Sequence, residues 1–182
     1  MFTAIRFTLL ILALGGLIYP LTMTMLGQAF FPVQANGSLI KQPAGQVVGS
    51  RLIGQAFTQS KYFHPRPAAN GYDASNSGGS NLGATSQKLI ARISKDTAAY
   101  QNENPAKHSI PVDAVTASAS NLDPHISLAN ALIQASRVAN ARHIDLDQVN
   151  GIVKKIAKKP LLAEAPYVNV LELNLALDRQ IP

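Results

Sequence analysis

The 182-residue sequence predicts a single globular domain of the α+β or α/β class, anchored to a membrane by one amino-terminal helix. The first observation is an uncharged apolar run from Phe7 to Phe31. Strand-like and helix-like patterns are then mixed over residues 32–182, which are enough for one compact domain with its own core. We therefore expect an amino-terminal segment over residues 1–6, a transmembrane helix over residues 7–31 and a soluble domain over residues 32–182.

The apolar run is long enough to cross a bilayer. At about 1.5 Å per residue, a helix over Phe7–Phe31 exceeds the ~30 Å hydrocarbon core. The alternative is a cleaved secretory signal, since Val33-Gln34-Ala35 has small residues at the spacing of a cleavage site. Signal cores usually span only about 7–15 residues, so this alternative requires Pro20 to end the apolar core.

Small residues recur along one side of the predicted span, at Gly16, Pro20, Thr24 and Gly27. Gly and Pro are common in membrane helices, which is one interpretation of this face. The other is helix packing, because small residues let two membrane helices approach closely. Both interpretations remain open from the sequence.

The positions of the basic residues predict the orientation of the span. Arg6 lies immediately before it, and the first basic residue after it is Lys41. Because Lys and Arg favour the cytoplasmic side, we expect a cytoplasmic amino terminus. Residues 32–182 are then periplasmic or extracellular.

Composition limits the possible chemistry. The absence of cysteine excludes disulfides, thiolate catalysis and sulfur-ligated metals. The net charge of +6 suits either an anionic lipid surface or nucleic acid, but only 6% of residues are aromatic and Trp is absent. We expect the lipid bilayer, and no nucleic acid, among the partners.

Local patterns predict the elements of the domain. Strands are expected over residues 46–50, 52–57, 110–118 and 167–178, and helices from a cap at Thr85 or Ser86 to Asn104, from Ser127 to Arg142 and from Asp145 to Ile156. In the second of these helices Leu128, Leu132, Ala135 and Val138 are expected to be buried, and Gln134, Arg137 and Arg142 to project elsewhere. The segment Tyr62–Gly83 is predicted to be an ordered functional loop anchored by Tyr62, Phe63, Arg66 and Tyr72.

No catalytic or metal site is predicted. The segment Gly78–Thr85 has the glycine spacing of a phosphate loop, but Ala84 occupies the position of the lysine. The four histidines, His64, His108, His125 and His143, lack ligand spacing. Ser118, Ser120, Asp123 and His125 resemble a hydrolase set without an oxyanion hole, so a membrane-anchored hydrolase or solute-binding domain is only an alternative.

Several motifs in order resemble those of the KdpC family, the C subunit of bacterial Kdp potassium-transporting ATPases. They are Tyr19-Pro20-Leu21, Leu52-Ile53-Gly54-Gln55, Tyr62-Phe63-His64, the run from Ser77 to Leu82, the run from Leu122 to Ser127, Arg137-Val138-Ala139, and the run from Val168 to Asp178. The resemblance implies a non-catalytic accessory subunit in the bacterial inner membrane, whose partners are a potassium-channel-like subunit and a P-type ATPase subunit.

The resemblance also implies a link to ATP. The family is described as a catalytic chaperone that raises the ATP affinity of the hydrolysing subunit, and Gln134 matches the glutamine proposed to contact nucleotide. The segment Ser118–Asp123 is likened to an ABC-type signature, with Asn121 in place of its glycine. ATP is therefore a possible ligand, and no tightly bound cofactor is expected. Because ATP is cytoplasmic, this role conflicts with the predicted orientation, which favours a domain that braces the complex from outside or covers the potassium entrance.

Overall fold

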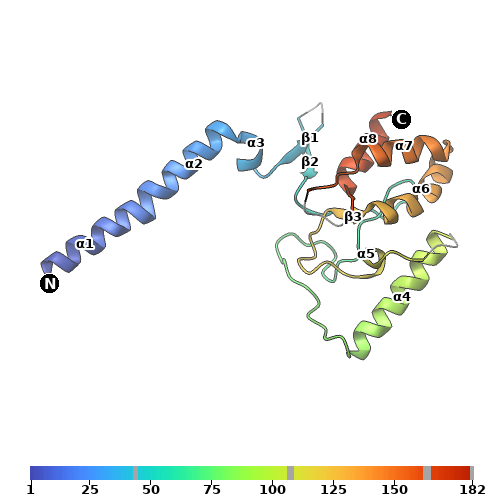
Figure 1. Ribbon diagram of the computed structural model, residues 1–182, viewed down its shortest axis with the longest axis horizontal. Coiled ribbons are helices and arrows are strands. Elements are labelled where there is room, and N and C mark those ends of the chain that lie inside the picture. The colour runs from blue at the N-terminus through green and yellow to red at the C-terminus, as the bar shows by residue number, and fades with distance from the viewer. Residues whose placement is uncertain (43–44, 106–108, 162–164, 181–182) are drawn as a thin grey trace. The chain divides into compact units, whose positions relative to one another are not determined.

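The computed structural model of the protein describes residues 1–182 except residues 43–44, 106–108, 162–164 and 181–182 (Figure 1). His108 lies outside the described residues. The chain forms two compact units, Met1–Ser50 and Arg51–Pro182. Each is described separately.

The first unit begins with one long apolar helix. It consists of α1 (Phe2–Ala13), the π-helical turn η1 (Leu14–Ile18) and α2 (Tyr19–Phe30). Together they give a 29-residue helix with a mean hydropathy of 2.0 and no buried residues in its most apolar window. The predicted apolar helix of membrane-spanning length is therefore present.

Pro20 explains the widened turn η1. A proline inside a helix has no N–H to donate, and its ring clashes with the carbonyl four residues earlier, here that of Gly16. The turn widens so that the Tyr19 N–H donates to the Leu14 carbonyl, five residues back. Hydroxyls assist the backbone nearby: Thr22 donates to the Ile18 carbonyl at 2.8 Å and Thr24 to the Pro20 carbonyl at 2.9 Å.

A small hairpin completes the first unit. After the short helix α3 (Pro32–Ala35), strand β1 (Leu39–Lys41) pairs antiparallel with β2 (Val47–Ser50). This confirms the strand predicted at residues 46–50.

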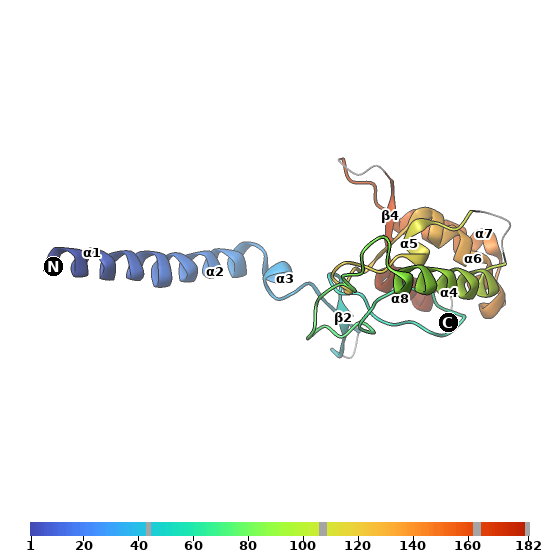
Figure 2. The same cartoon turned by 90° about the horizontal axis from the view of Figure 1, so that it is seen from below.

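The second unit is built on three helices and a two-stranded ribbon. Strand β3 (His125–Ser127) pairs antiparallel with β4 (Tyr167–Asn169), with Ile126 opposite Val168. Helices α6 (Leu128–Arg142), α7 (Leu146–Ile156) and α8 (Val170–Gln180) pack beside it (Figures 1 and 2). The buried core comprises Phe63, Ile126, Ala131, Ala135, Val138, Ala139, Val149, Ile152, Val153, Val168, Val170, Leu173 and Leu177. The predicted α+β class is confirmed.

The helix starts predicted from capping residues are confirmed. The Ser127 hydroxyl accepts a hydrogen bond from the Asn130 N–H at the start of α6, and Asp145 accepts one from the Asp147 N–H at the start of α7. Helix α4 (Gln87–Glu103) begins after Ser86 and ends before Asn104. The starts of α6 and α7 depend on capping bonds within one turn, whereas the Ser86 side chain makes no capping bond at the start of α4.

Helices replace one predicted strand and most of another, since of residues 167–178 only Tyr167–Asn169 form a strand. The run from Val170 to Asp178 belongs to α8, where Val170, Leu173 and Leu177 form a buried helical stripe and the Asn169 side chain accepts from the Glu172 N–H at 3.1 Å. Residues 110–118 contain only the helical turn α5 (Val112–Val115), which follows Pro111. In both cases the alternating apolar pattern fitted more than one element.

The strand predicted over residues 52–57 is also wrong. Gly54 instead lies against the backbone of the Leu122–Asp123 turn, and its N–H donates to the Leu122 carbonyl at 2.7 Å. A Cβ at this glycine would lie 2.7 Å from the Asp123 carbonyl oxygen, so only glycine fits without a shift. Residues 52–57 therefore pack against this turn through Gly54 and do not pair with a strand of the described chain.

Candidate functional site

The segment Tyr62-Phe63-His64 of the long loop is held by two buried side-chain amides. Asn174 of α8 accepts from the Phe63 N–H at 2.8 Å and donates to the Phe63 carbonyl at 3.0 Å. Gln134 of α6 holds His64 in the same way, at 2.7 Å to its N–H and 3.0 Å from its carbonyl. These two amides, Asn174 and Gln134, form what we call the amide clamp.

The structure places Gln134 inside the domain, with only 2% of the residue exposed. The expectation that this side chain projects away from the buried side of the helix is wrong. Its oxygen accepts from the His64 N–H and from Arg137 Nη2 at 2.8 Å. Its nitrogen donates to the His64 carbonyl and to Asn130 Oδ1 at 2.9 Å. A glutamine amide has two donors and two acceptor sites, so all four are used inside the domain.

Arg137 extends the amide clamp along the same loop. Its Nη1 donates to the carbonyls of Ser60 at 2.7 Å and Tyr62 at 2.9 Å, and its Nε donates to Asn104 Oδ1 at 3.2 Å. The sequence was right that Tyr62, Phe63, Arg66 and Tyr72 anchor the loop: Phe63 is fully buried, and Tyr72 donates from its hydroxyl to the Arg66 carbonyl. Asn174 and Arg137 were missed, because their loop partners are far away in the chain.

His64 faces two opposite charges. Its Nδ1 lies 3.2 Å from Glu103 Oε2, and its Nε2 lies 3.4 Å from Arg137 Nη1. Burial lowers the pKa of His64 and the Arg137 guanidinium lowers it further, against smaller opposing effects of the Gln59 carbonyl and of Glu103. The imidazole is therefore neutral near pH 7, and it serves the packing of the loop.

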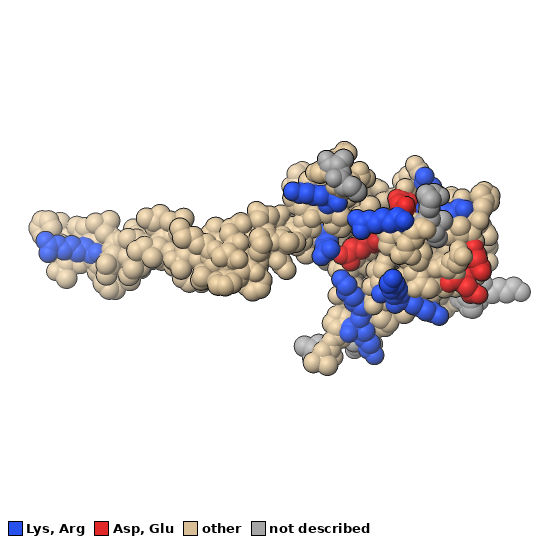
Figure 3. Space-filling model, turned by 90° about the horizontal axis from the view of Figure 1, so that it is seen from above, with Lys and Arg blue, Asp and Glu red and all other residues tan. Residues whose placement is uncertain are grey.

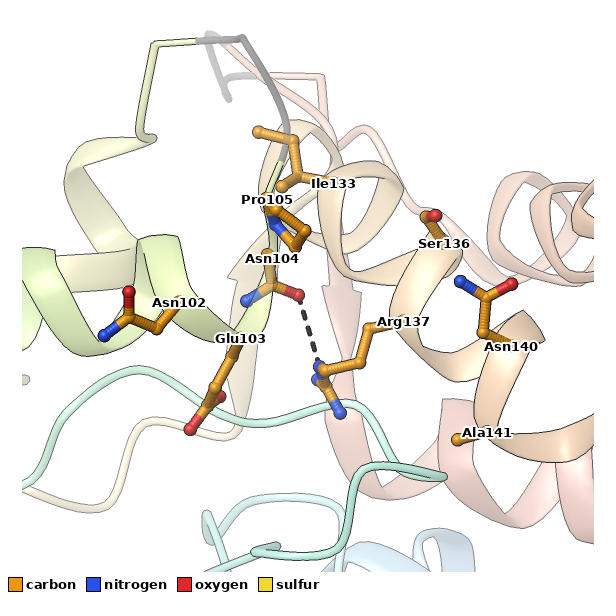
Figure 4. A pocket seen from close by; sticks show the side chains of 9 residues that line it. All are labelled: Asn102, Glu103, Asn104, Pro105, Ile133, Ser136, Arg137, Asn140 and Ala141. Carbon is orange, nitrogen blue, oxygen red and sulfur yellow. Dashed lines mark hydrogen bonds between the residues drawn. The ribbon is translucent and has the colours of Figure 1, made fainter.

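A cavity of about 580 Å³ opens beside this network (Figure 4). Its lining comprises Asn102, Glu103, Asn104, Pro105, Ile133, Ser136, Arg137, Asn140 and Ala141. Among the described residues of this lining, Arg137 is the cation, and its guanidinium already donates to four oxygen atoms of the domain. The lining carboxylate, Glu103, repels an anion. The described part of the lining therefore offers no free cation to a nucleoside triphosphate, whose phosphates bind to cations or N–H groups.

The degenerate phosphate loop is used for packing. The Gly78 N–H donates to the Ser120 carbonyl at 3.2 Å, so it is not free to bind an anion. A Cβ at Gly79 would lie 2.9 Å from the Ala119 carbonyl oxygen. The glycines thus allow two loop segments to approach each other closely.

The segment likened to an ABC-type signature is a turn in which Ser118 and Asn121 are buried, whereas Ala119 and Ser120 are exposed. Asn121 is 1% exposed and has a positive φ of 60°, a conformation that Asn adopts more readily than most residues. Its N–H donates to the Ser118 carbonyl at 3.3 Å, and its side-chain oxygen accepts from the Ala69 N–H. Asn121 therefore supports the turn and also anchors the loop.

The proposed hydrolase set does not assemble into a triad. Ser118 bonds to Ser120 through their hydroxyls at 3.1 Å, while Asp123 accepts from Arg66 at 2.8 Å and from the His125 N–H at 3.0 Å. Burial alone would raise the pKa of Asp123, but the hydrogen bonds from His125 and Arg66 hold it at about 2. Among the described residues, no three His, Cys, Asp or Glu side chains group as metal ligands.

The four small residues of the span lie on the long helix of the first unit. Gly16 belongs to η1, whereas Pro20, Thr24 and Gly27 belong to α2. A Cβ at Gly16 would meet no other atom of the described chain within 4 Å. A Cβ at Gly27 would lie 3.9 Å from Ala35 Cβ, so it is the Gly16 end of this face that is open to lipid or to another helix.

These features define a class of protein with one apolar helix of membrane-spanning length and one α+β domain. In this domain the amide clamp and Arg137 bind a loop of the same domain. Residues 1–179 match the family model described as K+-transporting ATPase, c chain. The chain is 50% identical to the potassium-transporting ATPase KdpC subunit of Mycobacterium tuberculosis (strain H37Rv), over 97% of this chain and 96% of the relative. It is 53% identical to the KdpC subunit of Caulobacter vibrioides, over 92% of this chain and 86% of the relative. The chain belongs to the KdpC family.

Proposed function

We propose that the chain is a non-catalytic accessory subunit of an ATP-driven potassium uptake complex, and that its domain lies outside the cytoplasm. Its partners are a potassium-channel-like subunit and a P-type ATPase subunit, and its role is to brace the assembly or to cover the potassium entrance. The relatives are named as subunits of a potassium-transporting ATPase, which supports this assignment.

The observation that carries the proposal is the complete internal use of Gln134. The residue that family resemblance links to nucleotide has its two donors and two acceptor sites occupied by His64, Asn130 and Arg137. A direct contact with ATP would require breaking buried hydrogen bonds, each of which leaves a polar group unpaired. If this subunit raises the ATP affinity of the ATPase subunit, as the family is described to do, it does so by assembling with that subunit. No nucleotide-binding site in this chain is then required.

The side of the membrane on which the domain lies can be tested with single cysteines, because the chain has none of its own. We expect Gln148→Cys, at an exposed position of α7, to react with a membrane-impermeant maleimide in cells whose outer membrane has been permeabilised. Thr3→Cys should react only after the inner membrane is opened, because Arg6 favours a cytoplasmic amino terminus. The reverse labelling pattern would place the domain in the cytoplasm and would overturn the proposal.

Assembly through the small-residue face is a second expectation. Gly16→Leu with Gly27→Leu should reduce co-purification with the partner subunits and leave membrane insertion intact, because two leucines block close helix approach. The matched control is Thr22→Leu with Ala29→Leu, whose positions lie on the opposite side of a helix at 100° per residue. If both double variants co-purify equally with the partner subunits, the small-residue face contacts only lipid and does not pack against a partner helix.

A further inference from the structure

A lysine-rich segment links α7 to β4 and carries a concentrated positive charge. Lys154 and Lys155 lie in the last turn of α7, and Lys158 and Lys159 follow the end of this helix at Ile156. All four side chains are exposed, and residues 154–161 contain no carboxylate. Lys and Arg side chains gather beside this part of the surface in Figure 3.

The segment projects from the body of the domain. The Lys158 N–H donates to the Tyr167 carbonyl and the Tyr167 N–H to the Lys158 carbonyl, both at 2.9 Å. These two bonds join Lys158 to Tyr167, and the described residues next to β4 stand out from the helices in Figure 2. Leu161 is 100% exposed, next to Lys159 and Pro160. We call Lys154, Lys155, Lys158, Lys159 and Leu161 the basic projection.

Internal interactions account for only part of this charge. Lys158 lies 3.5 Å from Glu172, which is already paired with Arg51 at 2.8 Å. Within the described residues, Lys154, Lys155 and Lys159 have no ion pair. The dipole of α7 favours cations in its last turn, but it falls off within that turn and so does not explain the two lysines beyond the helix end.

We propose that the basic projection binds the anionic phospholipid surface of the bilayer that holds the apolar helix. The lysines would contact the phosphate groups of the lipids, and Leu161 would enter the boundary between headgroups and acyl chains. A lipid surface fits this composition better than a protein does, because protein interfaces are depleted in Lys and enriched in Arg and aromatic residues. The segment 154–161 contains neither Arg nor an aromatic residue.

Because the apolar helix already holds the chain at the bilayer, weak contacts with lipid are enough for the basic projection to bind the membrane. The apolar helix ends at Phe30 and the second unit begins at Arg51 of the same chain, so the domain is tethered to the bilayer that holds the helix. Linking two binding events in one chain raises the effective concentration of the second. The proposal does not depend on which subunits the chain assembles with.

A fluorophore at the tip can test this proposal in the full chain. We would attach the environment-sensitive dye NBD to Leu161→Cys and reconstitute the protein in vesicles of neutral phosphatidylcholine, or in vesicles that also contain phosphatidylglycerol. NBD emission should be blue-shifted and brighter only with phosphatidylglycerol, and high salt should reverse this change. The same dye at Ile90→Cys, an exposed position of α4, should respond to neither lipid.

Variants that remove equal charge at two places distinguish an effect of the basic projection from an effect of the net charge of the chain. Each lysine near an anionic surface contributes about five-fold to membrane binding. Lys158→Gln with Lys159→Gln should therefore lower the ratio of membrane-bound to unbound basic projection on the order of 30-fold. Lys88→Gln with Lys95→Gln on α4 removes the same charge and should have no effect. Equal NBD spectra in the two lipids, or equal loss in the two double variants, would overturn the proposal. So would a blue shift in neutral vesicles that appears only when the complete complex is present, because it would identify a protein surface as the occupant.

Discussion

Replacing Gln134 by alanine is expected to lower the free energy of unfolding of the domain by about 3–5 kcal/mol. The substitution leaves the His64 N–H and carbonyl without their partner, and each unsatisfied buried group costs about 1–3 kcal/mol. It also leaves a small cavity at a position that is 2% exposed. Pulse proteolysis of the full chain in detergent micelles, over a series of urea concentrations, would measure the loss.

Asn174→Ala is the matched control for a role in nucleotide binding. It removes the other half of the amide clamp, two hydrogen bonds to Phe63, and should destabilise the domain to a similar degree. If Gln134 acts only through the fold, both variants should change the KM for ATP of the assembled complex equally, below their unfolding temperatures. A rise in KM with Gln134→Ala that Asn174→Ala does not cause would establish a direct nucleotide contact and contradict our proposal.

The elements that the sequence predicts correctly are those whose determinants are local. Ser127 and Asp145 each begin a helix by bonding to a backbone N–H two or three residues later, so their effect is visible in a short window. The apolar helix needs only length and composition. The strand predicted over residues 167–178 is right only for Tyr167–Asn169. Residues 170–178 were misassigned because Leu171, Leu173 and Leu177 fit an alternating pattern, whereas Val170, Leu173 and Leu177 fit a helical spacing.

The candidate site could be predicted only in part, since long-range contacts decide it. Nothing near Gln134 in the chain indicates that the backbone of His64, 70 residues away, will supply a donor and an acceptor to its amide. Helical spacing therefore placed Gln134 on the wrong side. Phe63, in contrast, was recognised as an anchor because a large apolar residue in a Gly-rich loop has little reason to be exposed.

Phe63→Ala is expected to destabilise the domain by about 3–5 kcal/mol, the usual cost of truncating a buried phenylalanine. The Phe63 side chain is fully buried, and it belongs to the core cluster formed with α6, α7 and α8. Since domains of this kind are stable by only about 5–15 kcal/mol, a large part of the stability would be lost. The urea midpoint from pulse proteolysis of the full chain would report it, and Phe57→Ala, at a partly buried position packed against the same core, should cost less.

The same variant tests whether the core contact and the amide clamp act as one unit. Phe63 enters the core directly beside His64, so the loop must be in register for the Gln134 amide to meet its partners. We expect the double variant Phe63→Ala with Gln134→Ala to lose less than the sum of the single losses, by about 0.5–3 kcal/mol, as found for residues of one network. Strict additivity would mean that the amide clamp forms without the aromatic anchor, and that the hydrogen bonds alone determine the position of the loop.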